Sequence, residues 1–249
     1  KSRGFGDVYK RQVLHSVNHC RCSLHRSLEN RRNAIATKPQ ASSKGSPWKT
    51  AEERAREREQ LRELKREAVL LAAAQEFNAR GFHNTTLDEI AKRLNVTKPT
   101  VYYYVTNKDE ILTETFRAGC GALAEAADEV DSSDLVGLDK LAEFMRRYAE
   151  LMTTDFVKNV ALLEDTSLGP EMRAEIREIK SAIDRRFRAF VAEGIRQGAI
   201  ADCDPKMAAF TIAGALNGIA RWYQPDGPLS PRDVAEITVN TLVTGLKAR

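Results

Sequence analysis

The sequence lacks the features that would place it among membrane proteins or the common classes of enzyme. No run of about 18 apolar residues, the length of a membrane-spanning helix, occurs in the chain. Phosphate-binding loops, G-x-G-x-x-G dinucleotide fingerprints, metal-binding His pairs and nucleophile elbows are also absent from its 249 residues. We therefore expect neither membrane association nor a catalytic site, and we expect no cofactor.

Cysteine and histidine are scarce, with four residues of each. Most of the histidines lie near the N-terminus, where His15, His19 and His25 surround Cys20 and Cys22. The Cys-x-Cys spacing is tighter than the two-to-four-residue gap typical of structural zinc sites. We therefore expect no metal site and interpret this stretch as part of a disordered or spurious tail.

Glycine and proline are few, with 14 and 8 residues, which favours a helical globular protein of one large or two small domains. The net charge of +4 is unevenly spread. Residues 1–45 hold ten Lys or Arg and two acidic residues, a net +8, so the remainder holds a net −4. Any nucleic-acid binding must therefore come from a local basic surface and not from a basic protein.

The first 48 residues do not read as part of the fold. The chain begins without Met, and residues 3–12 look like translated adapter sequence, which is excluded from fold reasoning. Residues 36–48 contain the Ser, Gly and Pro residues typical of a linker. We expect residues 1–48 to form a disordered or artefactual tail and a linker.

Residues 86–108 carry the strongest pattern in the chain. Thr86 can accept the backbone N–H of Glu89, and the Glu89 side chain can reach back to Thr86, which predicts a capped helix start. Asn95 suits a left-handed turn after this helix, and we expect Val96 to fill the gap beneath the turn. The apolar positions recur at helical spacing: Leu87, Ile90, Ala91 and Leu94.

A second short helix is predicted directly after the turn. Thr97 can cap it, and Pro99 is tolerated in its first turn. Val101 and Val105 would face the core. Two short helices joined by a tight turn form a helix-turn-helix, whose second helix enters the DNA major groove. The alternative is an ordinary helical hairpin, but three successive tyrosines cannot all pack inward, and an exposed Tyr can bond phosphate.

Further positions on both sides extend this pattern. They are Val69, Leu70, Ala73, Phe77, Gly81, Phe82, Thr85, Asn107, Lys108, Asp109, Glu110 and Leu112. Together with the helix-turn-helix, they resemble the TetR family of bacterial transcriptional regulators over about residues 65–115. Two departures are Asn95, where the family usually has Gly, and Val105, where Phe is frequent. The resemblance implies an N-terminal three-helix DNA-binding domain followed by a helical-bundle effector and dimerisation domain.

The resemblance also implies DNA contacts at particular positions. Phosphate contacts fix the register of a protein on DNA, and base contacts specify the sequence. Lys98 can pair with guanine O6 and N7. The residues implied to face the groove are Lys98, Pro99, Thr100 and Tyr103, and those implied to bind phosphates are Thr86, Tyr102, Tyr104 and Lys108.

The rest of the sequence predicts helices only. Residues 49–80 read as a long charged helix ending at Gly81, although Arg54, Arg56 and Arg58 could alternatively reach DNA phosphates. We therefore expect an all-α protein with a DNA-binding domain at residues 49–106 and a ligand-binding and dimerisation domain at 107–249. The later helices are predicted at residues 108–130, 138–154, 156–165, 170–197, 205–224 and from 231 onward.

In the resemblance, the middle helices bind a small effector and the last two helices form the dimer interface. Gly214, Gly218 and Trp222 recur every fourth residue, giving a stripe that a partner helix could bury. An intramolecular core is the alternative interpretation. The mix of Phe and Met favours a largely apolar effector. The candidate pocket walls are Phe116, Phe144, Tyr148, Met152, Phe156, Phe187 and Phe190, and the other candidate dimer contacts are Val239 and Leu242.

The implied function is that of a cytoplasmic, ligand-responsive regulator. We expect a repressor that binds a palindromic operator in double-stranded DNA as a homodimer, because one short recognition helix reads too few bases alone. Residues 195–231 resemble family members that sense acyl-CoA thioesters. Arg146, Arg147, Arg185 and Arg186 could meet a phosphate group, although a solvated face is the simpler interpretation. The competing classes are a protein-binding helical adaptor and, less favoured, an all-α enzyme.

Overall fold

The computed structural model describes residues 50–163 and 169–246. Within these ranges the chain is all-α, as the sequence predicts, with nine helices and no β-strand. None of these helices combines the length and the apolar character that crossing a membrane requires. The expected tail and linker, with the His/Cys stretch, lie outside the described residues and stay predictions.

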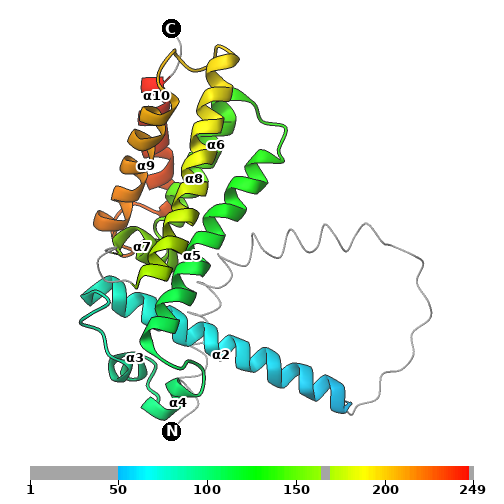
Figure 1. Cartoon of the computed structure of the whole chain (residues 1–249), viewed down its shortest axis with the longest axis vertical. Helices are drawn as coiled ribbons and strands as arrows, with labels where there is room; N and C mark the ends of the chain where they lie inside the picture. Colours follow the sequence, from blue (N-terminus) through cyan, green and yellow to red (C-terminus); the bar gives the residue numbers. More distant parts are fainter. Residues whose placement is uncertain (1–49, 164–168, 247–249) are drawn as a thin grey trace, which may run out of the picture. The chain divides into compact units, whose positions relative to one another are not determined.

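The helices begin and end within a few residues of their predicted bounds, and short connections join them. This agreement reflects the capping residues, Pro and Gly that mark most of the helix ends. The helices are α2 Ala51–Arg80, α3 Leu87–Arg93, α4 Lys98–Tyr102, α5 Lys108–Asp131, α6 Gly137–Leu151, α7 Asp155–Leu162, α8 Pro170–Arg196, α9 Pro205–Trp222 and α10 Pro231–Leu246 (Figure 1).

The local signals around α3 act as the sequence predicts. Gly81 follows α2 with a φ of +80°, a left-handed conformation that glycine adopts without strain. Thr86 and Glu89 form the capping box at the start of α3. Asn95 adopts a φ of 55° after α3, and Asn107 caps α5. The chain therefore turns at the positions where capping residues and residues that tolerate a positive φ predict a helix end.

Two expectations about the turn between α3 and α4 are wrong. Val96 is 39% exposed, and it is Leu94, at the end of α3, that packs against the apolar core. Thr97 precedes α4 as predicted, but its side chain makes no capping hydrogen bond. The Thr97 hydroxyl instead lies 2.9 Å from the hydroxyl of Thr100.

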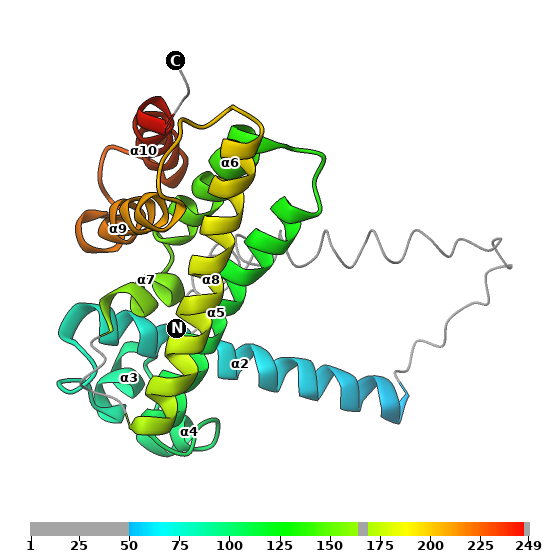
Figure 2. The same cartoon turned by 45° about the horizontal axis from the view of Figure 1, so that its top comes forward.

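The chain divides into two compact units, residues 1–68 and residues 69–249. In the first unit, residues 51–68 form the N-terminal part of α2. In the second unit, α3 and α4 lie at one end, and α9 and α10 lie toward the other (Figures 1 and 2). The long helices α5 and α8 contact each other along the unit and connect its two ends.

Two apolar clusters stabilise the second unit. The head core packs α2 to α5 together with parts of α7 and α8, and its fully buried side chains include Ile90, Val101 and Phe116. The body core joins α5 to α10 and includes Phe144 and Phe187. Because the head core continues from α3 and α4 into the later helices, the division expected between residues 106 and 107 falls inside one unit. That division is therefore a proposal about function.

Helix α7 approaches α5 closely at Gly119. A Cβ atom added to Gly119 would lie 2.6 Å from the carbonyl oxygen of Phe156 and 2.8 Å from Cγ2 of Val160. Atoms at such distances would overlap, so the contact requires glycine. Gly121, on the same helix, has no atom within 4 Å of the equivalent position.

We expect Gly119→Ala to lower the free energy of unfolding by about 1–3 kcal/mol, because the added methyl group overpacks the contact between α5 and α7. Gly121→Ala is the matched control. It should leave the free energy of unfolding unchanged or raise it by up to ~1 kcal/mol, since alanine has the higher helix propensity. Urea unfolding measures both values, and equal stabilities of the two variants would contradict the close contact.

Candidate nucleic-acid interface

Helix α4 is held from one side and exposed on the other. Val101 is fully buried and Val105 nearly so, and both belong to the head core. Tyr102 and Tyr103 are 50% and 67% exposed, whereas Tyr104 is partly buried against that core. The exposure of Tyr102 and Tyr103 argues against the alternative of a helical adaptor, which a buried tyrosine helix would have favoured. The structure brings five of the predicted contacts to one exposed surface: Lys98, Pro99, Thr100, Tyr102 and Tyr103.

The Lys98 ammonium already has a partner on this surface. Its Nζ lies 2.6 Å from Oδ2 of Asp88 in the first turn of α3, and both side chains are exposed. The hydrogen bond to Asp88 raises the pKa of Lys98, so the ammonium stays charged. Sequence reasoning missed Asp88, whose only signal was an acidic residue near a helix start. A contact between Lys98 and DNA must share the ammonium with this carboxylate.

Thr86 is exposed, but its hydroxyl takes part in the cap of α3. Thr86 Oγ1 accepts the backbone N–H of Glu89 at 3.3 Å, and Glu89 Oε2 accepts the backbone N–H of Thr86 at 2.8 Å. The bond from this backbone N–H is the main reason that the pKa of Glu89 is lowered. The Glu89 carboxylate therefore stays ionised, and it lies beside the residue expected to contact a phosphate.

Lys108 is bound within the protein. Its Nζ donates to the carbonyl oxygens of Phe82 at 2.8 Å, Thr85 at 3.0 Å and His83 at 3.4 Å. The ammonium also lies 4.3 Å from the centroid of the Phe82 ring. An ammonium has three N–H donors, so these carbonyls occupy all of them. Lys108 therefore supports the loop between α2 and α3, and the phosphate contact implied by the resemblance would require exchange of these bonds.

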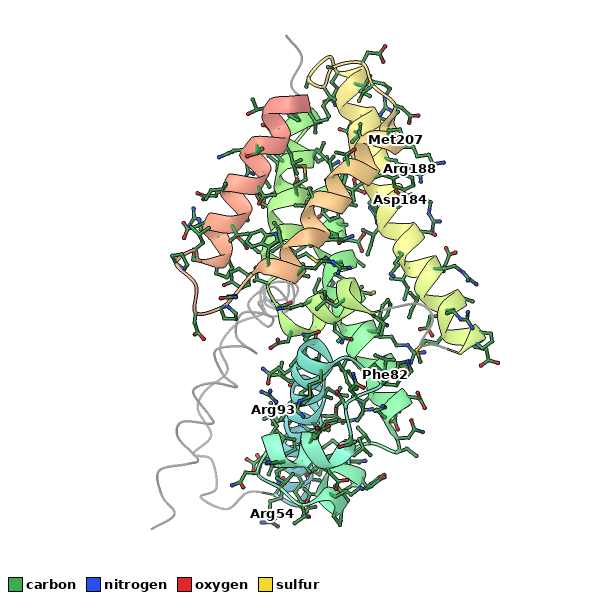
Figure 3. The ribbon with its side chains drawn as sticks, turned by 90° about the vertical axis from the view of Figure 1, so that its left-hand side faces the viewer. Arg54, Phe82, Arg93, Asp184, Arg188 and Met207 are labelled. Carbon is green, nitrogen blue, oxygen red and sulfur yellow. The ribbon has the colours of Figure 1, made fainter. Side chains whose placement is uncertain are left out.

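An ion-pair network joins α3 to α2. The buried Glu76 carboxylate lies 3.0 Å from Arg80 and 2.6 Å from Arg93. Arg80 also pairs with Glu89, so the network reaches both ends of α3. Figure 3 marks Arg93 at the last residue of α3. A buried carboxylate is costly without partners, so these pairs favour one arrangement of the two helices.

The candidate pocket residues fall into two groups. The ring centroids of Phe144 and Phe187 are 4.6 Å apart, and those of Phe144 and Phe190 are 5.4 Å apart, as in close aromatic packing. The residues in the body core are Phe144, Tyr148, Met152, Phe187 and Phe190, whereas Phe116 and Phe156 belong to the head core. The structure thus brings five of the seven together.

One polar pair lies at the edge of this aromatic group. The Tyr148 hydroxyl donates to Oδ1 of Asn217 on α9 at 2.8 Å. Burial raises the pKa of Tyr148, so the hydroxyl keeps its proton and remains a donor. Sequence reasoning missed Asn217, because a lone amide on a mostly apolar helix carries no recognisable motif.

The four arginines considered for phosphate binding all pair with carboxylates, which favours the solvated-face interpretation. A surface cavity of about 330 Å³ lies between α6 and α10. Three arginines and three glutamates line it, so it offers no net positive charge to a phosphate. The pairs are Arg146 with Glu143, Arg147 with Glu143 and Glu129, Arg185 with Glu178, and Arg186 with Asp128 and Asp131.

Helix α9 carries an exposed apolar stripe. Trp222 is 54% exposed, and Gly214 and Gly218 continue the stripe along the helix. Met207 is 59% exposed and extends the stripe to the first turn of α9. Met207 was not among the predicted contacts, because the predicted stripe began at Gly214.

Helix α10 exposes a different apolar residue from the one expected. Val239 is fully buried in the body core, so its expected place in a dimer contact is wrong. Ile237, two residues earlier and on the opposite side of the helix, is 56% exposed. Leu242 is partly buried against the body core. Periodicity located the apolar positions of α10 but did not distinguish its two sides.

Comparison with known protein families accounts for most of the described chain. Residues 69–115 match the family described as bacterial regulatory proteins, tetR family, and residues 134–246 match the tetracyclin repressor-like C-terminal domain. The chain is a TetR-family DNA-binding transcriptional regulator. The first match contains both α3 and α4, which confirms the resemblance predicted from residues 65–115. Members of this family are transcriptional regulators and not enzymes.

Individual relatives match this chain over nearly all of their own length. It is 27% identical over 186 residues to the uncharacterized HTH-type transcriptional regulator YhgD of Bacillus subtilis (strain 168), covering 74% of this chain and 97% of the relative. It is 25% identical over 183 residues to the fatty acid metabolism regulator protein of the same strain, covering 72% and 93%. The crystal structure of AibR in complex with isovaleryl coenzyme A and operator DNA is similar at a TM-score of 0.63, with 27% identity, covering 72% of this chain and 97% of AibR.

We expect Lys108→Met to weaken operator binding by the regulator without changing the salt dependence of binding. A lysine that neutralises a phosphate contributes about 0.9 to the slope of log K against log salt, whereas a lysine that supports a loop contributes nothing to it. The variant should also lower the free energy of unfolding by about 1–3 kcal/mol, because three carbonyl groups lose their donor.

Lys108→Arg separates charge from geometry in the same assay. The guanidinium keeps the positive charge but is planar, and it cannot reproduce the three-carbonyl arrangement of an ammonium. We expect Lys108→Arg to bind DNA as weakly as Lys108→Met. Full binding by the arginine variant, with a reduced slope for the methionine variant, would instead establish a direct phosphate contact.

Proposed function

We propose that this regulator is a repressor that binds a palindromic operator as a homodimer and is released by an acyl-CoA or a similar, largely apolar effector. The observation that carries the proposal is the exposed surface of α4. Val101 anchors the helix while Tyr102 and Tyr103 remain exposed. Tyr103 leaves most of its aromatic ring in contact with water. A partner that covers α4 would remove this apolar area from water, and DNA is the partner proposed here.

The proposed contacts divide into bases and phosphates. Lys98 lies in the first turn of α4 and can donate to guanine O6 and N7, with Asp88 limiting its reach. Thr100 and Tyr103 also face the groove with Pro99. Exposed Tyr and Thr hydroxyls bond phosphate oxygens. The residues proposed for phosphate contact are Thr86, Tyr102 and Tyr104, whereas Lys108 is proposed to hold the loop beneath them.

The proposed dimer forms through α9 and α10. Trp222 and Met207 expose apolar side chains at the two ends of α9, and Gly214 and Gly218 between them leave room for a partner helix. A two-fold interface presents the same stripe from each protomer and places two copies of α4 on one duplex. Residues 49–106 are accordingly assigned to DNA binding and residues 107–249 to ligand binding and dimerisation.

The proposed effector class rests on the body core and on the relatives. Phe144, Phe187 and Phe190 would supply apolar contacts to an effector that opens this core, and the amide of Asn217, whose oxygen accepts from Tyr148, would supply a donor for a carbonyl oxygen. One relative is named for fatty acid metabolism, and AibR was solved with isovaleryl coenzyme A and operator DNA. A bound dimer near its promoter would obstruct transcription in the cytoplasm, and effector binding would release it.

We expect Tyr103→Ala to weaken binding to duplex DNA from upstream of the regulator's own gene by roughly ten-fold or more, since direct contacts contribute about 1–3 kcal/mol each. Its free energy of unfolding should stay within about 0.5 kcal/mol of the wild type, because the side chain is exposed. Fluorescence anisotropy across a salt series measures the affinity.

Val96→Ala is the control for this measurement. Val96 is also exposed near α4 but is assigned no DNA contact, so its affinity should match the wild type. Equal binding by Tyr103→Ala and the wild type would contradict the proposed interface. Isovaleryl-CoA added to the same complex should release the DNA, whereas free coenzyme A should not.

We expect Trp222→Glu to weaken dimerisation by at least roughly 30-fold, because an aromatic anchor is replaced by a charge that must be desolvated. Affinity for the palindromic operator should then fall to that for a single half-site. Leu135→Glu makes the same kind of change at an exposed apolar residue before α6 and should remain dimeric. Sedimentation velocity measures both, and a dimeric Trp222→Glu variant would contradict this interface.

A further inference from the structure

Gln75 on α2 makes two hydrogen bonds in opposite directions. Its Oε1 accepts from Nη1 of Arg93, the last residue of α3, at 3.2 Å. Its Nε2 donates to Oδ2 of Asp155, the first residue of α7, at 2.9 Å. A reversed amide would place a donor against the guanidinium and an acceptor against the carboxylate, so the partners fix its orientation. Gln75 therefore joins the end of α3 to the start of α7.

A second amide pair strengthens the link between α2 and α7. Asn78 Nδ2 donates to the carbonyl oxygen of Asp155 at 2.9 Å, and Asn159 Nδ2 lies 3.4 Å from Oδ1 of Asn78. Asn159 is only 3% exposed, and its own Oδ1 has no partner among the described residues. These two bonds of Asn78 add polar contacts between α2 and α7 to the bond that Gln75 makes.

Helix α7 belongs to both apolar cores. Val157 packs in the body core, whereas Val160 packs in the head core together with Phe156. The close contact at Gly119 holds the same helix against α5. We call α3 and α4 the head and α6, α9 and α10 the body. Any tilt of the head relative to the body must therefore change the packing of α7 or its bonds to α2.

Apolar packing alone tolerates several nearby tilts, because hydrophobic contacts are not directional. Hydrogen bonds are directional and weaken steeply when they are bent. Arg93 also forms an ion pair with the buried Glu76. A movement of the end of α3 would therefore disturb its bonds to both Gln75 and Glu76. The bond between Gln75 and Asp155 is the step at which this polar network reaches α7.

We propose that Gln75 is a positioning residue for operator recognition. By fixing the tilt of α3 and α4 relative to the body, it sets the separation of the two reading helices in the dimer. The regulator then accepts one distance between operator half-sites and discriminates against others. This inference rests on the proposed function as a dimeric DNA-binding protein. Gln75 itself is partly buried, and the two hydrogen bonds of its side chain go to α3 and α7.

Two substitutions test the bond while keeping a polar side chain at each position. In Gln75→Glu, the new carboxylate still accepts from Arg93 but repels Asp155. In Asp155→Asn, Gln75 can still donate to the new amide oxygen. In the double variant, the amide introduced at position 155 can donate to the carboxylate introduced at position 75, which restores a bond between α2 and α7. Gln75→Ala removes both bonds without adding a charge.

The measurement is the dissociation constant for a series of palindromic duplexes whose half-sites are moved apart by one base pair at a time. The wild type should prefer one spacing. Gln75→Glu and Gln75→Ala should lose roughly five-fold or more of that preference, the equivalent of about one hydrogen bond. Their affinity for a single half-site should change less than about two-fold, because no contacting residue is altered. Asp155→Asn and the double variant should keep the wild-type profile.

The outcomes separate this inference from the proposed function. A wild type that prefers one spacing, with Gln75→Glu and Gln75→Ala keeping the same preference, would overturn the role of Gln75 alone. Loss of preference in the double variant equal to that of Gln75→Glu would also overturn it, because the restored bond would have no effect. If the wild type binds every duplex of the series with the same dissociation constant as a single half-site, the protein does not bind DNA as a dimer. This result would reject the proposed function and the inference together.

Discussion

The burial of Val101 in the head core is the contact on which the reading surface depends. Helix α4 spans only Lys98–Tyr102, far too short to persist by itself in water. Val101 fixes one side of the helix, and the opposite side, with Tyr103, is then necessarily exposed. The same core also contains Val160 of α7 and Ile176 of α8. The reading helix is thus fixed to helices that begin far beyond it in the sequence.

A polar layer adds orientation to this apolar anchorage. Glu76, Arg80 and Arg93 join α2 to α3, and Lys108 joins the loop before α3 to the start of α5. A transcriptional regulator of this family needs both kinds of contact, because apolar burial supplies stability and directional bonds supply a defined angle. The angle matters since two copies of α4 must meet one duplex in register.

The sequence predicted the order, the type and the approximate bounds of the helices. Capping boxes, prolines in first turns and left-handed residues act within four or five positions, so Thr86, Asn95 and Asn107 could be read directly. The family followed from the same stretch, residues 65–115, and the comparisons confirmed it. The candidate DNA residues followed from this resemblance, because the family's contact positions could be carried over to the matching residues of the same stretch.

Contacts between distant residues were decided only by the tertiary structure. Val239 and Ile237 are both apolar residues of α10, and only the packing of that helix against the body core shows which one is exposed. Lys108 reads as a cation at a helix start, yet the loop carbonyls it binds lie more than 20 residues earlier. The sequence by itself determined the local elements and the family, since short-range chemistry encodes them. The partners of Lys108 and Gln75 depend on which helices meet, and such long-range pairing is set by the packing of the whole unit.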